Sequence, residues 1–199
     1  MSVPHRDDFG ARIGMWLFLF TEMMLFGGLF LLYSAYRSMH PLEFHAASEE
    51  LNVVLGVFNT LVLLTSSWTL ALSLTAVEKG ETRLAKGLLA ATILLGVVFL
   101  VDKGFEWSAE FRHGIYPNGP ELLKRAPGEV LFFGLYFTMT GLHGLHVLAG
   151  MTLLSVALLK LAQGEVKLGN SVFLENIGLY WHLVDVIWIF LLPLFYLAA

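Results

Sequence analysis

The hydrophobic residues of this chain gather in five long stretches that are separated by polar segments. The apolar stretches cover residues 13–36, 54–77, 85–107, 130–161 and 173–197. A bilayer core takes about 20 apolar residues per spanning helix, and each stretch reaches that length. The polar segment before the fourth stretch contains Tyr-Pro-Asn-Gly-Pro at 116–120, a cluster that cannot continue a helix. The pattern predicts an all-α, polytopic membrane protein, a bundle of five transmembrane helices that forms a single domain over residues 1–199.

The positions of lysine and arginine predict how this bundle is oriented, because positive residues concentrate on the cytoplasmic side. The N-terminus and the second and fourth connecting segments share one side of the membrane. Seven basic residues lie on that side: Arg6, Arg12, Lys79, Arg83, Lys86, Lys160 and Lys167. Four lie on the opposite side: Arg37, Arg112, Lys124 and Arg125. We therefore expect the N-terminus inside the cell and the C-terminus outside.

The composition agrees with a membrane location and narrows the chemistry. Hydrophobic residues make up 57% and charged residues 14% of the chain, and the mean hydropathy is +0.72. A soluble domain of this length carries more charged surface. Cysteine is absent, which excludes disulfides, thiolate metal sites and a cysteine nucleophile. The net charge is −4 and no basic cluster occurs, so nucleic acid is not expected as a partner.

Titratable residues inside the apolar stretches are the candidate functional residues, because an ionisable group in lipid is costly unless it faces the bundle interior. Two of the stretches carry such residues in pairs spaced i, i+3, so that each pair shares a helix face. At about 1.5 Å per residue, five side chains from three helices lie near one depth. We expect them to face one another as a buried intramembrane polar network, to which a glutamate near the start of the last stretch is added. Its members are Glu22, His143, His146, Glu175, His182 and Asp185.

Three interpretations of this network remain open. It can be a structural network that locks the first, fourth and fifth helices together, since each group is otherwise unpaired in hydrocarbon. It can include a proton path or a carboxyl of perturbed pKa at Glu22. It can bind a metal or a bis-histidine haem through His143 or His146 together with His182. The first interpretation is favoured, and no catalytic, cofactor-binding or metal-binding residue is assigned.

A second polar cluster lies late in the third stretch. Lys103 and Glu106 are one turn apart, and Trp107 follows directly. This arrangement is typical of an interfacial cluster, in which a lysine extends its side chain towards the membrane surface, pairs with a carboxylate and lies beside an aromatic belt residue.

Several of these residues also carry a resemblance to a known family. The string Thr-Gly-Leu-His-Gly-Leu-His-Val at 140–147 is similar to the Thr-Gly-Phe-His-Gly-Leu-His-Val signature of subunit III of haem-copper terminal oxidases. Tyr-Trp-His-Leu-Val-Asp-Val-Ile-Trp at 180–188 resembles the closing motif of that family, and Glu175 falls where the family has a glutamate. The Thr21–Glu22 pair in its aromatic-rich stretch, the segment 59–67 and Glu106 also resemble family positions. The likeness covers nearly the whole chain.

The resemblance implies a five-helix bacterial form of subunit III, since the long form has two additional helices at its start. It implies an accessory subunit without its own cofactor, in an enzyme that reduces dioxygen and pumps protons. Haem and copper are expected in partner subunits I and II, and the chain in the bacterial cytoplasmic membrane. In the long form, phospholipid lies between the first two helices and the rest, so bound phospholipid is a weaker expectation here.

The host complex stays open in the sequence. Thr21–Glu22 favours a cytochrome c oxidase, whereas a quinol oxidase and a nitric oxide reductase with a related small subunit are the alternatives within the family. Two alternatives lie outside it. A proton-coupled transporter predicts a broken helix or an inverted repeat, and a membrane cytochrome b predicts histidines that ligate haem from facing helices.

Overall fold

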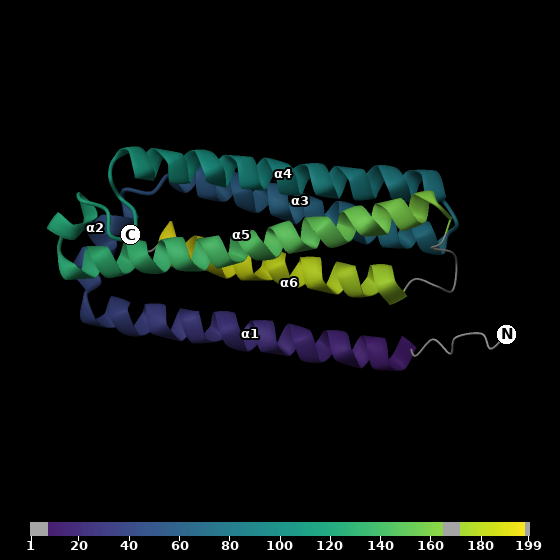
Figure 1. Ribbon diagram of the computed structural model, residues 1–199, viewed down its shortest axis with the longest axis horizontal. Helices are drawn as coiled ribbons and strands as arrows, with labels where there is room; N and C mark the ends of the chain where they lie inside the picture. Colours follow the sequence, from purple (N-terminus) through teal and green to yellow (C-terminus); the bar gives the residue numbers. More distant parts are fainter. Residues whose placement is uncertain (1–7, 165–171, 198–199) are drawn as a thin grey trace.

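The computed structural model describes residues 8–164 and 172–197. Long helices follow one another in alternating directions and form an elongated bundle (Figure 1). Five of them are long and apolar enough to cross a membrane. They are α1 (Asp8–Met39), α3 (Val53–Glu78), α4 (Thr82–Arg112), α5 (Pro127–Ala162) and α6 (Val172–Phe195). The prediction of an all-α bundle of five transmembrane helices is confirmed.

The helices extend beyond the predicted apolar stretches at most of their ends. α4 continues to Arg112, five residues past its predicted end, and α1 begins at Asp8. Two short elements were not predicted: α2 (Pro41–Ser48) and the 3₁₀ helix η1 (Leu122–Lys124). The apolar pattern marks the hydrocarbon core only, and a helix keeps its backbone hydrogen bonds as it passes into the polar headgroup region.

Local sequence signals explain where several helices begin and end. The side-chain oxygen of Asn52 accepts a hydrogen bond from the backbone N–H of Leu55 at 3.2 Å and so caps α3. Gly80, at φ 77°, follows α3 in the left-handed conformation that favours glycine and allows the tight turn into α4. Pro127 is the first residue of α5, where its missing N–H is not needed.

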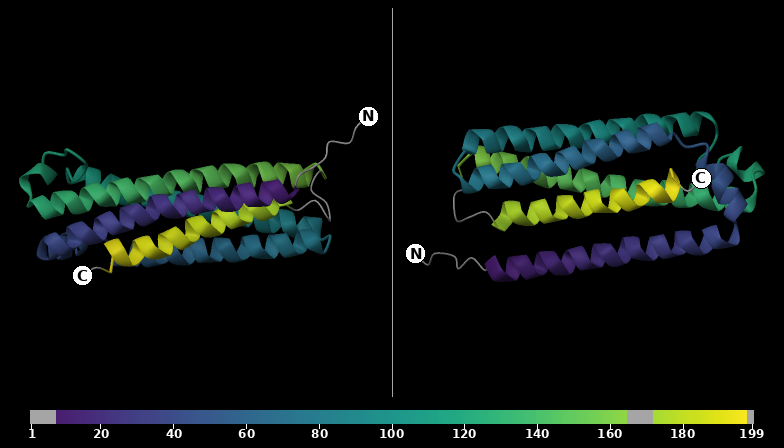
Figure 2. Two further views of the ribbon diagram at one scale, coloured as in Figure 1. Left: turned by 90° about the horizontal axis from the view of Figure 1, so that it is seen from below. Right: turned by 180° about the vertical axis from the view of Figure 1, so that it is seen from behind.

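The order of packing places α5 and α6 next to each other and α1 at the edge. α3 and α4 pack along their lengths as an antiparallel hairpin, α5 contacts α4 and α6, and α6 also contacts α3. α1 contacts α5 and α6, and it forms one side of the bundle in Figure 1 and in the right view of Figure 2. Its apolar window is 11% buried, against 50% for α6. The rest of the chain therefore covers far fewer side chains of α1 than of α6.

Glycines let three helices approach one another around a single tryptophan. Trp181 of α6 is fully buried and its indole N–H donates to the Ser66 hydroxyl at 3.0 Å. A Cβ atom added to Gly150 of α5 would lie 2.7 Å from the indole ring, and one added to Gly96 of α4 would lie 3.0 Å from it. The indole therefore fills the space that these two glycines leave, and the helices pack closely there.

Basic residues separate to the two ends of the bundle as the sequence predicted. Arg12, Lys79, Arg83, Lys86 and Lys160 belong to the end at which α1 and α4 begin, and Arg37, Arg112, Lys124 and Arg125 to the other. The start of α1 and the end of α6 lie at opposite ends of the bundle (Figure 1). Arg6 and Lys167 lie outside the described residues. Which end faces the cytoplasm stays a prediction.

Candidate functional site

The structure brings Glu22 and His146 together between α1 and α5. Glu22 Oε2 lies 2.9 Å from His146 Nε2, and His146 Nδ1 lies 2.7 Å from the carbonyl oxygen of Leu142. A carbonyl oxygen only accepts, so Nδ1 carries a proton, and one further proton must lie between Nε2 and the carboxylate for a hydrogen bond to form. The pair ties α1 to α5 near the midpoint of both helices.

Two residues in the middle of α6 bind a different neighbour, α3. His182 Nδ1 hydrogen-bonds the Ser67 hydroxyl of α3, and the indole N–H of Trp188 donates to the Thr60 hydroxyl of α3 at 3.0 Å. Asp185 is 3% exposed, and its carboxyl group interacts with the Ser67 side chain of α3, although neither oxygen meets the geometry of a hydrogen bond among the described residues. The expected single layer that joins α1, α5 and α6 is thus divided into an α1–α5 pair and an α3–α6 contact.

His143 occupies an aromatic environment in the centre of the bundle. Its side chain is fully buried, and its ring centroid lies 5.5 Å from that of Phe99 and 5.3 Å from that of Trp188. Neither ring nitrogen has a hydrogen-bond partner within residues 8–164 and 172–197. Although His143 and His146 are one turn apart, the first packs against rings and the second binds Glu22.

Glu175 stands apart from the other members of the predicted network. It lies in the first turn of α6, where its Oε2 is 2.8 Å from Arg12 Nη2 of α1. The ion pair ties the start of α1 to the start of α6 at the bundle end.

The cluster at Lys103 is buried, which corrects the expectation of a lysine that extends to the membrane surface. Lys103 and Glu106 are each 7% exposed, and Lys103 Nζ lies 3.1 Å from Glu106 Oε2. The ammonium also donates to the hydroxyls of Tyr136 at 3.1 Å and Tyr196 at 2.6 Å. Both hydroxyls in turn donate to Glu106 Oε1 at 2.5 Å. The expected ion pair is present, and two tyrosines from α5 and the end of α6 complete it.

Trp107 does not take part in this cluster of hydrogen bonds. Its ring packs against Phe111 and Phe137, with centroids 6.3 and 5.3 Å away. Tyr136 and Tyr196 were not predicted as members. Their signal in the sequence was only that each is a polar aromatic residue near one limit of an apolar stretch, which many belt tyrosines share.

The histidine geometry does not suit a bis-histidine haem. Two ligating imidazoles must direct ring nitrogens at one iron from opposite sides. Here His146 bonds a carboxylate, His182 bonds a hydroxyl and His143 packs between rings, so the three do not face a common space. Among the described residues, no group of three or more His, Asp or Glu side chains is arranged to hold a metal ion.

Long apolar helices that are joined at several depths by polar side chains define a multi-pass integral membrane protein. The chain belongs to the cytochrome c oxidase subunit III family, whose family model matches residues 5–199. The resemblance found in the sequence is therefore confirmed, and with it a place among the subunits of haem-copper oxidases. Its five spans and its bacterial relatives make it a multi-pass protein of the bacterial cytoplasmic membrane.

Individual relatives come from both cytochrome c and quinol oxidases. A cytochrome c oxidase subunit 3 from Corynebacterium diphtheriae is 30% identical over 181 residues, 90% of this chain and 83% of that protein. One from Thermostichus vulcanus is 31% identical over 188 residues, 94% of this chain and 87% of that protein. A cytochrome bo(3) ubiquinol oxidase subunit 3 from Pseudomonas aeruginosa is 30% identical over 197 residues, 98% of this chain and 89% of that protein.

Proposed function

We propose that this chain is the accessory subunit III of a proton-pumping cytochrome c oxidase, without a cofactor of its own. It packs against subunit I, which carries haem and copper, in a complex that also contains subunit II. Its function is to keep the active site of subunit I stable during turnover and to support proton uptake and oxygen reduction. A scaffold can do this by stabilising one conformation of a neighbour without contacting substrate.

The observation that carries this proposal is the internal pairing of the polar groups. Glu22 bonds His146, Ser67 bonds His182, and Lys103 and Glu106 bond each other and two tyrosines. Side chains used in this way stiffen the bundle, because each would be left unpaired in hydrocarbon if its helix moved away. This supports a structural role for those residues of the predicted set that are paired within the chain, which His143 and Asp185 are not.

The electron donor of the host is proposed as cytochrome c. The Thr21–Glu22 pair supports that host, whereas the quinol oxidase relative is as similar to this chain as the cytochrome c oxidase relatives are. A tag on this chain is used to purify the complex, and reduced-minus-oxidised and carbon monoxide difference spectra are recorded. Haem in the complex and none in the separated chain is the expected result, and the haem type then identifies the host. Haem that stays with the separated chain would refute the accessory role.

The role of Glu22 can be tested by replacing it with glutamine. A glutamine amide can donate to His146 Nε2 while Nδ1 still donates to Leu142, so the α1–α5 contact survives in neutral form. We expect Glu22→Gln to assemble and to keep most of the initial oxidase activity. Loss of proton uptake in a complex that is assembled and stable would contradict a structural role and assign Glu22 to a proton path.

A proton-coupled transporter is the alternative from another class, and the helices give it little support. Transporter sites of that kind are built on discontinuous helices near the midplane. α1, α3, α4 and α5 each run without interruption through the depth at which the polar residues lie.

The orientation and the lipid contacts complete the proposal. The larger number of basic residues at the end where α1 begins supports the N-terminus inside and the C-terminus outside. Membrane lipids are the remaining partners, and the exposed aromatic and aliphatic side chains of α1 support contact with their chains.

A further inference from the structure

α1 packs against the rest of the bundle along a narrow line. Its buried side chains are Leu19, Phe26 and Tyr33, which are seven residues apart and so recur about once every two turns on one side of the helix. Lipid chains are as apolar as these side chains, so helices in a membrane are held together by close packing and hydrogen bonds. A helix with so little packing depends on its polar contacts.

The packing of α1 weakens from its end at α2 towards its start. Tyr33 is fully buried against the rings of Phe44 in α2 and Phe195 in α6, with centroids 5.4 and 5.1 Å away, and its hydroxyl donates to the carbonyl oxygen of Leu194. Residues 9–18, by contrast, include no buried side chain. The well-packed end is the one from which the chain continues into α2 (Figure 1). Segments with few buried contacts open at the lowest cost, so the start of α1 is the part that moves most easily.

The contacts between the start of α1 and α6 are exposed. Arg12 Nη2 lies 2.8 Å from Glu175 Oε2, and the two side chains are 56% and 32% exposed. The Asn176 amide donates to the carbonyl oxygen of Ala11 at 3.2 Å, also in an exposed position. Exposed ion pairs contribute little to stability. These contacts therefore open and close at little cost.

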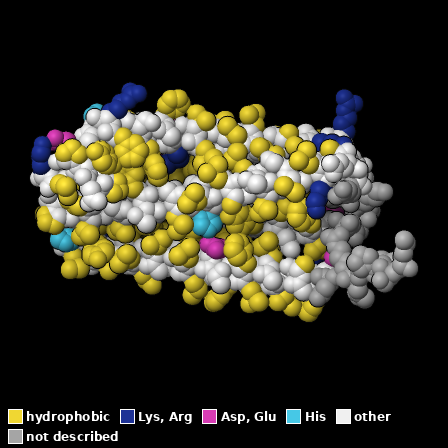
Figure 3. All heavy atoms as spheres, in the orientation of Figure 1, with side chains coloured by type: hydrophobic (Ala, Val, Ile, Leu, Met, Phe, Trp, Pro, Cys, Tyr) yellow, Lys and Arg dark blue, Asp and Glu magenta, His cyan; other side chains and the backbone are white. Residues whose placement is uncertain are grey.

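The hydrogen bond between Glu22 and His146 is the protected contact near the middle of α1. Oε2 and Nε2 are 2.9 Å apart, and the side chains are only 14% and 15% exposed. Figure 3 shows an acidic and a histidine side chain in contact near the middle of the visible face, between hydrophobic side chains. Breaking this bond in hydrocarbon leaves both groups without a partner. It is therefore the contact that decides whether the first half of α1 stays in place.

A groove lies between α1 and α6 beneath the loosely packed part of α1. It has a volume of about 430 Å³, and Trp16 and Met23 of α1 and Leu179 and His182 of α6 are among the residues that line it. Atoms that face an unfilled space lack contacts on that side. α1 can therefore move away from α6 here with little loss of packing.

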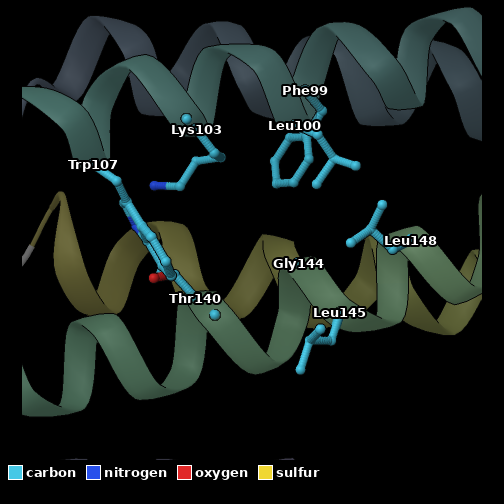
Figure 4. A pocket seen from close by; sticks show the side chains of 10 residues that line it. Phe99, Leu100, Lys103, Trp107, Thr140, Gly144, Leu145 and Leu148 are labelled. Carbon is cyan, nitrogen blue, oxygen red and sulfur yellow. The ribbon is translucent and has the colours of Figure 1, made fainter.

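A groove alone does not loosen a helix, as the second groove, between α4 and α5, shows. It has a volume of about 260 Å³, with Lys103 and Trp107 at one end (Figure 4). Lys103 ties α4 to Tyr136 of α5 and to Tyr196 after α6, and α4 also packs along the whole of α3. α4 is thus fixed on two sides, whereas α1 lies at the edge of the bundle.

We infer that α1 is a hinged arm. It pivots about Tyr33 and α2, and the Glu22–His146 bond is the catch that holds its first half against α5 and α6. The structure shows the closed arm. In the open arm, the part of α1 before Glu22 moves away from α6, which widens the α1–α6 groove and uncovers His182 and the Glu22–His146 pair. The arm thereby controls access to these polar groups from the membrane, whichever oxidase contains the chain.

Distance measurements by pulsed electron paramagnetic resonance on the full chain in phospholipid nanodiscs test the hinge. The chain has no cysteine, so spin labels attach only to introduced pairs. Ile13→Cys with Leu84→Cys joins the start of α1 to the start of α4, and Met39→Cys with Leu123→Cys joins the end of α1 to η1. The four side chains are 43%, 52%, 70% and 62% exposed, so the labels fit without repacking. We expect two distances or one broad distribution for the first pair and a single narrow distance for the second.

Removing the catch tests its role in the same assay. Glu22→Leu removes the hydrogen bond to His146 and should raise the open fraction of the first pair about three- to ten-fold, the factor expected for one hydrogen bond. The second pair should not change. Ser67→Ala is the matched control, because it removes the hydrogen bond between α3 and His182 of α6 and leaves the contacts of α1 intact. It should leave both distributions as they are in the unaltered chain.

Three results would overturn the inference. A single narrow distance for the first pair in the unaltered chain would exclude the hinge, and this measurement decides if Glu22→Leu does not fold. Equal broadening of both pairs would show that α1 detaches as a whole and does not pivot. A folded Glu22→Leu protein with an unchanged open fraction, or an effect of Ser67→Ala as large as that of Glu22→Leu, would show that the Glu22–His146 bond is not the catch.

Discussion

Replacing Lys103 by methionine removes a positive charge that α4, α5 and α6 share in the interior of the bundle. Its ammonium bonds Glu106, Tyr136 and Tyr196, and both tyrosine hydroxyls bond the same carboxylate. Lys103→Met leaves that carboxylate buried without a counter-charge, which costs about 3–5 kcal/mol when one partner of a buried pair is removed. At about 2–4 °C per kcal/mol for a chain of this size, the melting temperature should fall by roughly 6–20 °C.

The double variant separates the charge from the hydrogen bonds. In Lys103→Met with Glu106→Gln, the amide oxygen can still accept from both tyrosines, and no buried charge is left unpaired. We expect the double variant to cost about 1 kcal/mol, less than Lys103→Met alone, because only neutral hydrogen bonds are lost. The two changes therefore couple by roughly 2 kcal/mol or more, which a double-mutant cycle measures.

Thermal unfolding of the purified protein in detergent or bicelles is the assay, and a second pair in the chain supplies the control. Lys124 and Glu121 have the same one-turn spacing at 2.7 Å, but their side chains are 69% and 54% exposed. Lys124→Met should cost less than about 1 kcal/mol, as exposed pairs do. Additive effects in the Lys103–Glu106 cycle, or a Lys103→Met shift no larger than that of Lys124→Met, would refute the reasoning.

Two further predictions concern packing and the end of the bundle. Gly150→Ala places a Cβ 2.7 Å from the Trp181 ring and should destabilise the protein by about 1–3 kcal/mol. Gly134→Ala is the control, since its added Cβ meets nothing within 4 Å, and it should change stability by less than about 0.5 kcal/mol. Equal melting temperatures for the two variants would contradict the close packing around Trp181. Arg125 donates hydrogen bonds to Glu50 and Glu129, and the bond that it donates to Glu50 is the main cause that raises the pKa of Arg125 above its ordinary value. A raised pKa gives a stabilisation that is complete below the unfolded-state value and is lost only as the pH rises through the folded-state value. Arg125→Gln should therefore lower stability by at most about 1 kcal/mol, and by the same amount at every pH from 6 to 9. Melting curves of the variant and the unaltered protein, recorded in pairs across this range, measure the loss. A loss that changes with pH would contradict the pairing of Arg125 with Glu50 and Glu129.

The candidate residues were found from the sequence more reliably than their partners. A charged or titratable residue inside an apolar stretch is visible because hydrocarbon makes it costly, and Glu22, His146 and Lys103 were found in this way. The partners of several such residues were ordinary in the sequence. Ser67 and Tyr196 are residue types that are common in membrane helices and at their ends, so nothing in the sequence distinguished them. Their role is visible only once the packing of the helices is known.

The division of the predicted layer also shows that the sequence does not determine which polar residues become partners. Residues at one depth were expected to meet, and Glu22 and His146 do. His182 meets α3 instead, because α6 lies between α3 and α1 and the Nδ1 atom of His182 is directed at Ser67 of α3. Depth follows from counting residues along each helix, whereas direction depends on how each helix is rotated against its neighbours.

The sequence by itself determined the number of spans, their approximate limits, the family and the depth of each titratable side chain. The spans and depths follow from the thickness of the hydrocarbon core and the fixed rise of a helix, which act along one dimension. The family follows from the motifs at 140–147 and 180–188. Only the tertiary structure decided that Lys103 is buried against two tyrosines, that Trp181 fills the space beside two glycines, and that α1 packs along a narrow line. Those outcomes depend on helix rotation and on the close approach that small residues allow between helices distant in sequence.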